Sequence, residues 1–340
     1  MKKVSIVLMG YGNVGRAFLC LVKDKSEILQ ERYGLSLCFS AIVELGGTLC
    51  FPRTFDPESI VQDWPDIAFL KTSPYWKPGY DVFGALDELD GEVLVDCTPS
   101  RILKGTSEIS SLHLALERGW NVVTANKGPL VADFRGLIKK AKQKKVELKM
   151  SGATAAALPT IDVGCYSLAG TSVTRIEGIL NGTTNYILTR ISKGVHYDEA
   201  VKEAQEKGIT EPDPSLDLEG WDTAFKILLI TNNVCDTDFS LDDVRIEGIK
   251  NMPSGLIEEG REEDKALKLM GIYSAGGNEP DIQVKPSIIN RAHPLFGVDD
   301  TNKGITFHTD TMSAVTVTGG KSDPRGAAAA LLKDIINIYR

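Results

Sequence analysis

The chain has 340 residues, of which 42% are hydrophobic and 25% are charged, an ordinary balance for a globular protein. This length predicts two domains or one large α/β unit. The net charge of −8 argues against nucleic acid or anionic lipid as the main partner. No apolar run approaches the roughly 18 residues that a membrane helix needs, so we expect no membrane partner.

The six cysteines lie far apart and form no C-x-x-C pair. Their spacing favours neither a disulfide framework nor a metal knuckle, and it predicts a reducing compartment, the cytoplasm. The apolar run after the two N-terminal lysines stops at Gly10 without a small-residue cleavage site. It therefore predicts a first β-strand rather than a signal peptide.

The first 150 residues alternate β-branched runs with helix-like stretches. Alternation of this kind predicts an α/β fold with a Rossmann-type, doubly wound parallel sheet. The predicted strands are 4–9, 37–44, 92–98, 121–126 and 146–150, and the predicted helices are 14–29, 107–118 and 133–145.

After Ser151 the pattern changes, and a connector rich in small residues leads into a region with the mixed order of an α+β domain. The predicted strands there are 175–182, 244–249, 281–289, 305–310 and 313–319, and the predicted helices are 183–192, 197–208, 218–234 and 325–340.

A G-x-G-x-x-G motif directly follows the first predicted strand and opens the first helix. In such a loop the first glycine allows the tight turn, the second lets the backbone approach a pyrophosphate, and the third permits close helix–strand packing. The helix N-terminus supplies N–H groups for the phosphates. We expect dinucleotide binding by Gly10, Gly12, Asn13, Val14 and Gly15; the alternative is a glycine-rich turn without a ligand.

Three further candidates follow the carboxyl ends of predicted strands, where doubly wound sheets bind their ligands. Glu44 ends the second strand, where an acid accepts a ribose 2′-OH; the alternative is a solvated strand end. Thr98 and Lys127 follow two later strands and belong near the nicotinamide, although Lys127 alternatively is a surface lysine. Because Arg53, the nearest cation, lies nine residues beyond Glu44, we expect use of NAD and NADP with a preference for NAD.

The segment 210–226 carries five carboxylates and ends on Lys226. Asp217 is a natural helix N-cap, and Asp222 with Lys226 forms an ordinary i, i+4 pair. Neither explanation accounts for Glu211, which stands between a threonine and a proline, or for a lysine among apolar residues. Partial desolvation favours the neutral form of such a lysine, whereas a neighbouring carboxylate favours the charged form. Lys226 is therefore a candidate proton donor and acceptor.

On these motifs the chain resembles the homoserine dehydrogenase family over nearly its whole length. The resemblance rests on GYGNVG, TANKGPL, ILNGTTNYIL, EPDPSLDLEGWDTAFK and GGKSDPRGAAAALLKD. It implies reversible reduction of L-aspartate 4-semialdehyde to L-homoserine with NAD(P)H, on the route to threonine and methionine. It also implies a homodimer, and a nucleotide domain (1–150) to which 312–340 returns, with a substrate and dimerisation domain at 151–311.

The resemblance also implies residue roles. Lys226 resembles the proton donor to the aldehyde oxygen, and Lys127 resembles a second lysine near the nicotinamide. Glu211 matches the carboxylate that holds the substrate's amino end, and Asp217 and Asp222 match two further acids of that pocket. Thr98 falls where the family contacts the cofactor.

The chain departs from its relatives in two places. Many relatives bind a monovalent cation through a glutamate, but Ser151 stands at that position, which leaves only the carbonyls of Thr154 and Ala156 as ligands. We also expect the short form of the enzyme, without the C-terminal regulatory domain of longer members.

Two alternatives remain. One is another Rossmann dehydrogenase that acts on a related amino acid or semialdehyde. An acylating semialdehyde dehydrogenase needs a nucleophilic cysteine, for which Cys97 and Cys165 are the candidates, although plain core thiols are more usual. A non-catalytic dinucleotide sensor needs only the glycine loop, and the presence of Lys226, Lys127, Glu211 and Asp217 argues against it.

Overall fold

The computed structural model describes residues 1–55, 67–100, 107–276, 279–320 and 323–340. The chain divides into two compact units. Unit 1 comprises Met1–Ala156 and Asp323–Arg340, and unit 2 comprises Ala157–Ser322. The sequence placed these boundaries at 150 and 311, whereas the returning C-terminal segment begins at Asp323, because the preceding strand belongs to the sheet of unit 2.

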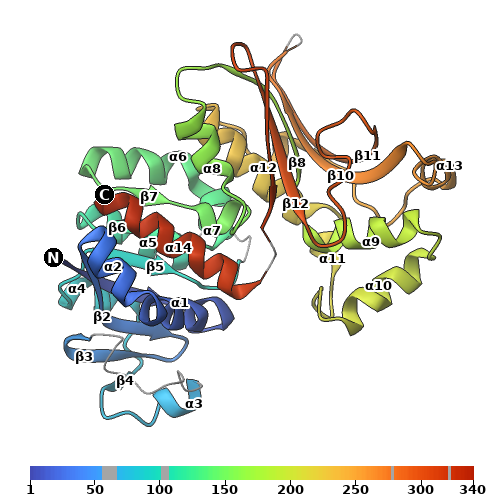
Figure 1. The fold of residues 1–340 in the computed structure, drawn as a ribbon. Coiled ribbons are helices and arrows are strands. Elements are labelled where there is room, and N and C mark those ends of the chain that lie inside the picture. The colour runs from blue at the N-terminus through green and yellow to red at the C-terminus, as the bar shows by residue number, and fades with distance from the viewer. Residues whose placement is uncertain (56–66, 101–106, 277–278, 321–322) are drawn as a thin grey trace. The chain divides into compact units, whose positions relative to one another are not determined.

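Unit 1 is built on a seven-stranded sheet of order β4-β3-β2-β1-β5-β6-β7 (Figure 1). Its strands are β1 (Lys2–Met9), β2 (Leu35–Glu44), β3 (Gly47–Phe55), β4 (Trp76–Pro78), β5 (Val93–Asp96), β6 (Asn121–Thr124) and β7 (Leu148–Lys149). Strands β2, β1, β5, β6 and β7 pair in parallel, which confirms the predicted doubly wound sheet. The sheet is not wholly parallel, because β3 and β4 add an antiparallel edge that the sequence did not predict.

The helices of unit 1 are α1 (Asn13–Asp24), α2 (Ser26–Tyr33), α3 (Ile67–Leu70), α4 (Val82–Glu88), α5 (Ser107–Glu117), α6 (Lys127–Lys144), α7 (Ser151–Thr154) and α14 (Pro324–Tyr339). The prediction of one helix over 14–29 is wrong, because the backbone leaves the helical region at Lys25. Helix α6 begins earlier than predicted, with a non-helical residue at Asp133.

The core of unit 1 joins the two ends of the chain. Apolar side chains of β1, β2 and α1 pack in one cluster with the buried Leu331, Leu332 and Ile335 of α14. Burying each of these side chains contributes about 1.5–3 kcal/mol. The C-terminal helix is therefore an integral part of unit 1.

Unit 2 carries a six-stranded sheet of order β13-β12-β8-β10-β11-β9. Its strands are β8 (Val173–Ile179), β9 (Val244–Ile246), β10 (Lys265–Ser274), β11 (Asp281–Asn290), β12 (Lys303–Thr309) and β13 (Ala314–Gly319). Its helices are α8 (Thr160–Asp162), α9 (Gly182–Ser192), α10 (Tyr197–Glu206), α11 (Ser215–Leu218), α12 (Trp221–Val234) and α13 (Ser254–Glu259), with a π-helical turn at Val163–Ser167 and a 3₁₀ turn at Leu241–Asp243. Helices α9 and α12 pack against β10.

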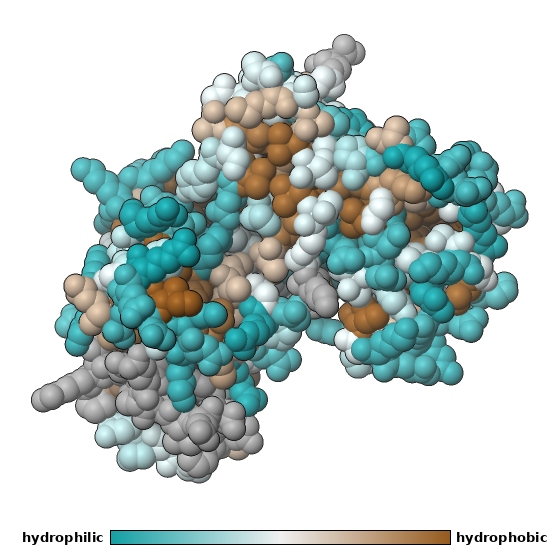
Figure 2. All heavy atoms as spheres, viewed as in Figure 1, coloured by the Kyte–Doolittle hydropathy of each residue, from teal (hydrophilic) through white to brown (hydrophobic). Residues whose placement is uncertain are grey.

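The predicted helix 218–234 is interrupted, since Gly220 adopts a left-handed conformation (φ 87°) that separates α11 from α12. Strand β10 was not predicted. Polar side chains cover most of the visible surface of each unit, and apolar side chains gather in smaller areas (Figure 2). Among the described residues, no helix combines the length and apolar character needed to cross a membrane.

Candidate active site

The glycine loop of unit 1 lies between β1 and α1, and two of its glycines have no room for a side chain. Gly10 has φ 94°, and a Cβ there would lie 2.7 Å from the carbonyl carbon of Cys97. A Cβ at Gly15 would lie 2.2 Å from the carbonyl oxygen of Gly10. At Gly12 a Cβ would meet no atom within 4 Å, so the second glycine keeps open the space in front of the helix.

Helix α1 begins at Asn13, and no described side chain caps its first turn, which also contains no acidic residue. The N–H groups of Asn13, Val14 and Gly15 thus lie at an uncapped positive helix end, a site that suits a phosphate. The sequence predicted both the loop and this helix start.

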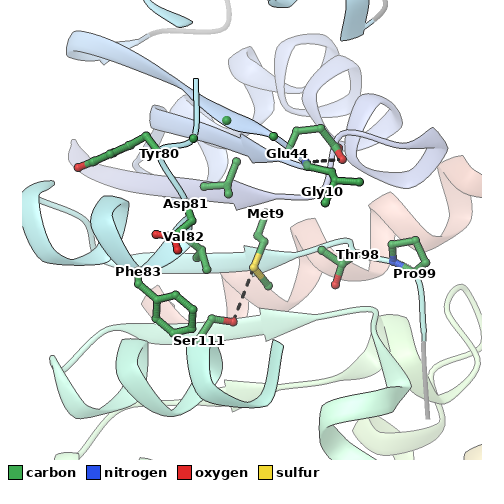
Figure 3. A pocket seen from close by; sticks show the side chains of 15 residues that line it. Met9, Gly10, Glu44, Tyr80, Asp81, Val82, Phe83, Thr98, Pro99 and Ser111 are labelled. Atoms are coloured by element: carbon green, nitrogen blue, oxygen red, sulfur yellow. Dashed lines mark hydrogen bonds between the residues drawn. The ribbon is translucent and has the colours of Figure 1, made fainter. Parts of the chain in front are cut away.

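Glu44 ends β2 beside the glycine loop. Its carboxylate accepts hydrogen bonds from the backbone N–H of Tyr11 at 2.6 Å and of Leu45 at 2.8 Å. Glu44, Gly10 and Thr98 line a cavity of about 390 Å³, and Figure 3 shows Glu44 beside Gly10, with Thr98 further along next to Pro99. Both candidate polar residues, Glu44 and Thr98, therefore reach the same cavity. The side chain of Arg53 is outside the described part of the chain.

A buried polar network connects the ends of β5 and β6. The Asp96 carboxylate is fully buried and accepts hydrogen bonds from Thr98 Oγ1 at 2.6 Å and from Thr124 Oγ1 at 3.0 Å. Asn126 donates from Nδ2 to Thr98 Oγ1 at 2.8 Å, and its Oδ1 accepts from Gly128 N at 2.9 Å, which caps α6. The network fixes the backbone on either side of Lys127.

Lys127 is the first residue of α6 and is half-buried. Its backbone N–H donates to Ser100 Oγ at 2.9 Å, which holds the helix start to the segment after β5. The structure thus places Lys127 and Thr98 at neighbouring strand ends, as the sequence predicted from strand order.

Ser151 contacts a charged pair on α14. Its Oγ donates to Asp334 Oδ1 at 2.8 Å and accepts from Lys333 Nζ at 2.8 Å, and Lys333 Nζ lies 2.7 Å from the same Asp334 oxygen. Burial raises the pKa of Asp334, and Lys333 opposes this shift. Among the described residues, no group of three or more His, Cys, Asp or Glu side chains is arranged to hold a metal ion.

The acidic segment of unit 2 folds so that Lys226 meets two acceptors. Lys226 lies on α12, and its Nζ donates to Asp222 Oδ2 at 2.5 Å and to the carbonyl of Leu180 at 2.9 Å. The side chains of Lys226 and Asp222 are 12% and 15% exposed, so the pair is shielded from water but open at one side. The i, i+4 pair predicted from the sequence is present, and it is part of a larger cluster.

That cluster includes Asn181 and Asp217. Asn181 Nδ2 donates to Asp217 Oδ1 at 2.7 Å and to Asp222 Oδ2 at 2.8 Å. Burial, and next the charge of Asp222, raise the pKa of Asp217, whereas Lys226 and the hydrogen bond from Asn181 lower it. Two carboxylates, one amide and one ammonium therefore converge here.

The prediction that Asp217 caps a helix is wrong. Asp217 lies inside α11, and Gly220 precedes α12 at the cap position. The segment turns at Gly220, so Asp217 reaches Asn181 instead of the start of α12.

Glu211 lies before α11 and is exposed. Within the described chain its carboxylate has no hydrogen bond or ion pair. It is thus available to a ligand, but the geometry of unit 2 does not join it to the Asn181 cluster.

The two candidate cysteine nucleophiles do not suit that role. Burial, together with the charge of Asp96, raises the pKa of Cys97 well above its usual value, which keeps the thiol protonated. The thiol of Cys165 is 3.1 Å from Asn233 Oδ1. A cysteine-dependent semialdehyde dehydrogenase is therefore disfavoured.

Sequence reasoning missed Asn181 and Asp96 as site residues. Asn181 precedes a helix directly after a strand, which is the signal of an N-cap, and its second role depends on partners 36 and 41 residues away. Asp96 ends a strand at the sheet edge where ligands bind, so its position was the available signal.

A doubly wound unit with a glycine cradle and a second unit with a lysine held by carboxylates define a two-unit dehydrogenase of the dinucleotide-binding class. The family model described as homoserine dehydrogenase matches residues 159–336. The chain belongs to the homoserine dehydrogenase family, as its motifs indicated.

Two relatives and one solved structure match this chain over nearly their whole length. A homoserine dehydrogenase of Methanocaldococcus jannaschii is 31% identical over 337 residues, 99% of this chain and 98% of that protein. An NAD(+)-dependent homoserine dehydrogenase of Pseudomonas canavaninivorans is 30% identical over 350 residues, 100% of this chain and 97% of that protein. A solved hyperthermophilic archaeal homoserine dehydrogenase in complex with NADPH has a TM-score of 0.82 at 25% identity, covering 99% of this chain and 98% of that one.

Proposed function

We propose that the chain catalyses the reversible, NAD(P)-dependent reduction of L-aspartate 4-semialdehyde to L-homoserine, on the route to threonine and methionine. The observation that carries the proposal is the Lys226 ammonium, held between Asp222 and the carbonyl of Leu180 beside Asp217. A sensor of dinucleotides needs no such cluster.

The nucleotide belongs to unit 1. Its residues fit a dinucleotide, because a Cβ at Gly10 or Gly15 would collide with backbone while the space at Gly12 is open. The N–H groups at the start of α1 would bind the pyrophosphate, Glu44 would accept a hydrogen bond from the ribose hydroxyl, and Thr98 and Lys127 would lie at the nicotinamide end. When bound, the nicotinamide supplies the hydride.

Lys226 moves the proton. In reduction its ammonium donates a proton to the aldehyde oxygen, and in oxidation its amine accepts the proton of the homoserine hydroxyl. Asp222 accepts a hydrogen bond from Nζ at 2.5 Å, and the carbonyl of Leu180 accepts another at 2.9 Å, so the two acceptors fix the direction of Nζ. Shielding from water strengthens these interactions, because the local dielectric constant is lower than in bulk solvent.

Two acids beside Lys226, Asp217 and Asp222, bind the substrate's ammonium group together with Glu211, which lies outside that cluster. Asp217, Asp222 and Glu211 bring carboxylates to one segment, and Glu211 is exposed and unpaired within the described chain. An α-ammonium is a strong hydrogen-bond donor, and charge-assisted contacts of this type are roughly twice as strong as neutral ones.

We propose that the enzyme uses both cofactors and prefers NAD. A relative is named NAD(+)-dependent, and another was solved with NADPH. The described residues lining the cavity include Glu44 and Asp81 and no lysine or arginine. A carboxylate accepts a hydrogen bond from the free ribose 2′-OH of NAD and repels the 2′-phosphate of NADP.

The assembly we propose is a homodimer formed through unit 2. The six-stranded sheet has a concavity of about 630 Å³, lined by residues that include Glu177, Met270 and Gln283, and it offers a docking surface to a second copy. Sedimentation velocity of the full chain tests this. Residence in the cytoplasm stays a prediction from the spacing of the cysteines.

The decisive experiment replaces Lys226 by Met. If Lys226 donates the proton, kcat should fall on the order of 10²- to 10⁴-fold, with nucleotide binding unchanged. The matched control is Lys207→Met at the C-cap of α10, which also breaks an i, i+4 ion pair, with Glu203 at 2.7 Å, and should leave kcat near wild type.

Glu211→Gln separates binding from chemistry. It should raise KM for homoserine with little change in kcat, because an ammonium contact made equally in the ground and transition states is uniform binding.

Retention by Lys226→Met of more than about a third of wild-type kcat would exclude the role of Lys226 as proton donor. Failure of the wild-type protein to form homoserine from the semialdehyde would refute the proposed activity.

A further inference from the structure

Asn181 lies between β8 and α9 and is buried, with 5% of its surface exposed. Its side-chain oxygen caps α9, since Oδ1 accepts the backbone N–H of Thr184 at 2.8 Å. The opposite amide orientation would place Nδ2 against this N–H donor and Oδ1 against two carboxylates. The neighbours therefore fix which end of the amide faces the acids.

The amide nitrogen joins two helices. Its two hydrogens go to Asp217 of α11 at 2.7 Å and to Asp222 of α12 at 2.8 Å. Helix capping explains the contact of Oδ1 with Thr184 but neither of the Nδ2 contacts. Any good N-cap residue supplies an acceptor, whereas only asparagine among the usual ones adds a pair of donors.

The same region also positions the lysine. Asp222 Oδ2 accepts both from Asn181 and from Lys226 Nζ, and Lys226 donates further to the carbonyl of Leu180. Residues 180 and 181 thus hold both Lys226 and the carboxylate to which it is paired. The charged groups that act on Asp217 are Asp222, which disfavours its ionised form, and Lys226, which favours it.

We propose that Asn181 is a positioning residue for proton transfer: its amide bridges Asp217 and Asp222, keeps both carboxylates acceptors, and so keeps Lys226 aimed at the substrate oxygen. This inference rests on the proposed role of Lys226. Without the bridge, two carboxylates face each other and share protons at a higher pH, since donors to the ionised form lower a pKa and a like charge raises it. Asp222 would then pair less with Lys226.

The test uses Asn181→Asp in the full-length enzyme. Aspartate has the same shape and caps a helix as well as asparagine does, but it has no donor and adds a third negative charge. We expect kcat to fall roughly 10- to 100-fold, as for other groups that orient a reacting residue. The acidic limb of the kcat–pH profile should move to higher pH by about one unit, the effect of one hydrogen bond to a charged group.

Asn181→Ser provides a second variant, because serine also caps helices but adds no charge. It should shift the acidic limb in the same direction and by less. The control for added charge in unit 2 is Asn302→Asp, at an exposed position, which should leave the pH profile unchanged. Nucleotide binding and the circular dichroism spectrum show whether each variant is folded.

A role in capping alone predicts that Asn181→Asp keeps kcat within about twofold and leaves the acidic limb in place, because aspartate and asparagine are comparable caps. That result overturns the inference. If it occurs while Lys226→Met is inactive, the proposed function stands without the bridge. If Lys226→Met is active, the proposed function itself is refuted.

Discussion

Replacing one glycine of the loop at a time by alanine should separate effects on stability from effects on nucleotide binding. Gly12 has φ −77°, an ordinary value, and a Cβ there meets no atom within 4 Å. Gly12→Ala should leave the protein as stable as wild type or slightly more so, since alanine reduces the entropy of the unfolded chain by about 0.4–1 kcal/mol.

The same methyl group should impair binding. It occupies the space in front of the uncapped first turn of α1, where the pyrophosphate must approach N–H groups. Displacing the phosphates removes one or two charge-assisted hydrogen bonds of about 1.5–3 kcal/mol each. The nucleotide Kd should rise on the order of 10- to 10³-fold.

Gly10→Ala and Gly15→Ala are the contrasting variants. An alanine at position 10 would adopt a left-handed conformation (φ 94°), which costs about 1–2 kcal/mol, and its Cβ would also collide with the backbone of Cys97. A Cβ at Gly15 would overlap the carbonyl of Gly10, and overpacking of this kind costs about 1–3 kcal/mol. Both should lower Tm by several degrees, at roughly 2–4 °C per kcal/mol for a unit of this size.

The assay combines thermal unfolding without nucleotide and fluorescence titration with NADH and NADPH for all three variants. We expect Gly12→Ala to lose affinity at an unchanged Tm, whereas the other two lose Tm first. The reasoning is refuted if Gly12→Ala binds either nucleotide within threefold of wild type. It is equally refuted if Gly12→Ala is destabilised as strongly as Gly10→Ala.

Two carboxylates give further predictions. Glu44→Ser should raise kcat/KM for NADP relative to NAD, measured with both cofactors; an unchanged ratio would show that Glu44 does not contact the ribose, and Arg53 would be tested next. The folded-state pKa of Asp217 is raised above its usual 3.8, so its stabilising effect is present at low pH and is lost as pH rises through the folded pKa. Asp217→Asn should abolish this fall in the free energy of unfolding, measured by urea denaturation across pH, while weakening homoserine binding. A parallel pH dependence in wild type and Asp217→Asn would contradict the assignment.

The parallel strands of unit 1 could be predicted because their β-branched runs alternate with amphipathic helices. The antiparallel edge was missed although its signal was present. Leu45 and Gly46 form a two-residue connection between β2 and β3, with Gly46 at φ 90° and Glu44 paired with Gly47. A glycine-containing connection between two apolar runs is a hairpin signal, and here Gly46 is followed by Gly47, the first residue of β3. Pro52 within the second run weakened it.

Strand β10 was missed for a different reason. It carries Lys268, and a lysine in the sequence predicts a solvent-exposed position, yet this side chain is only 2% exposed. Its Nζ donates to the carbonyl of Val298 at 2.6 Å and to Asp299 at 2.8 Å. These partners, 30 and 31 residues away in the sequence, offset the cost of burying the charge. A local sequence pattern around Lys268 does not include them, so it could not predict the burial.

The candidate site residues divide along the same line. The surroundings of Gly10, Gly12 and Lys226 could be predicted because they depend on immediate neighbours in the sequence. The cap at Asp217 could not be judged correctly, because the turn at Gly220 redirects its carboxylate towards Asn181, the N-cap residue of α9.

Asn126 in unit 1 and Asn181 in unit 2 have the same two roles, since each caps a helix and donates hydrogen bonds to polar groups of its candidate site. Each follows a strand, and each uses Oδ1 to cap the next helix, through Gly128 N at 2.9 Å and Thr184 N at 2.8 Å. Each then turns Nδ2 to the polar groups of its site, Thr98 in one unit and the two aspartates in the other. The strand end before Asn126 lies where doubly wound sheets bind their ligands, and in both units capping fixes the amide, so its donors are oriented before any ligand arrives. Aspartate, serine and threonine cap as well but cannot donate two hydrogen bonds, which is why an asparagine cap directly after a strand indicates a functional position.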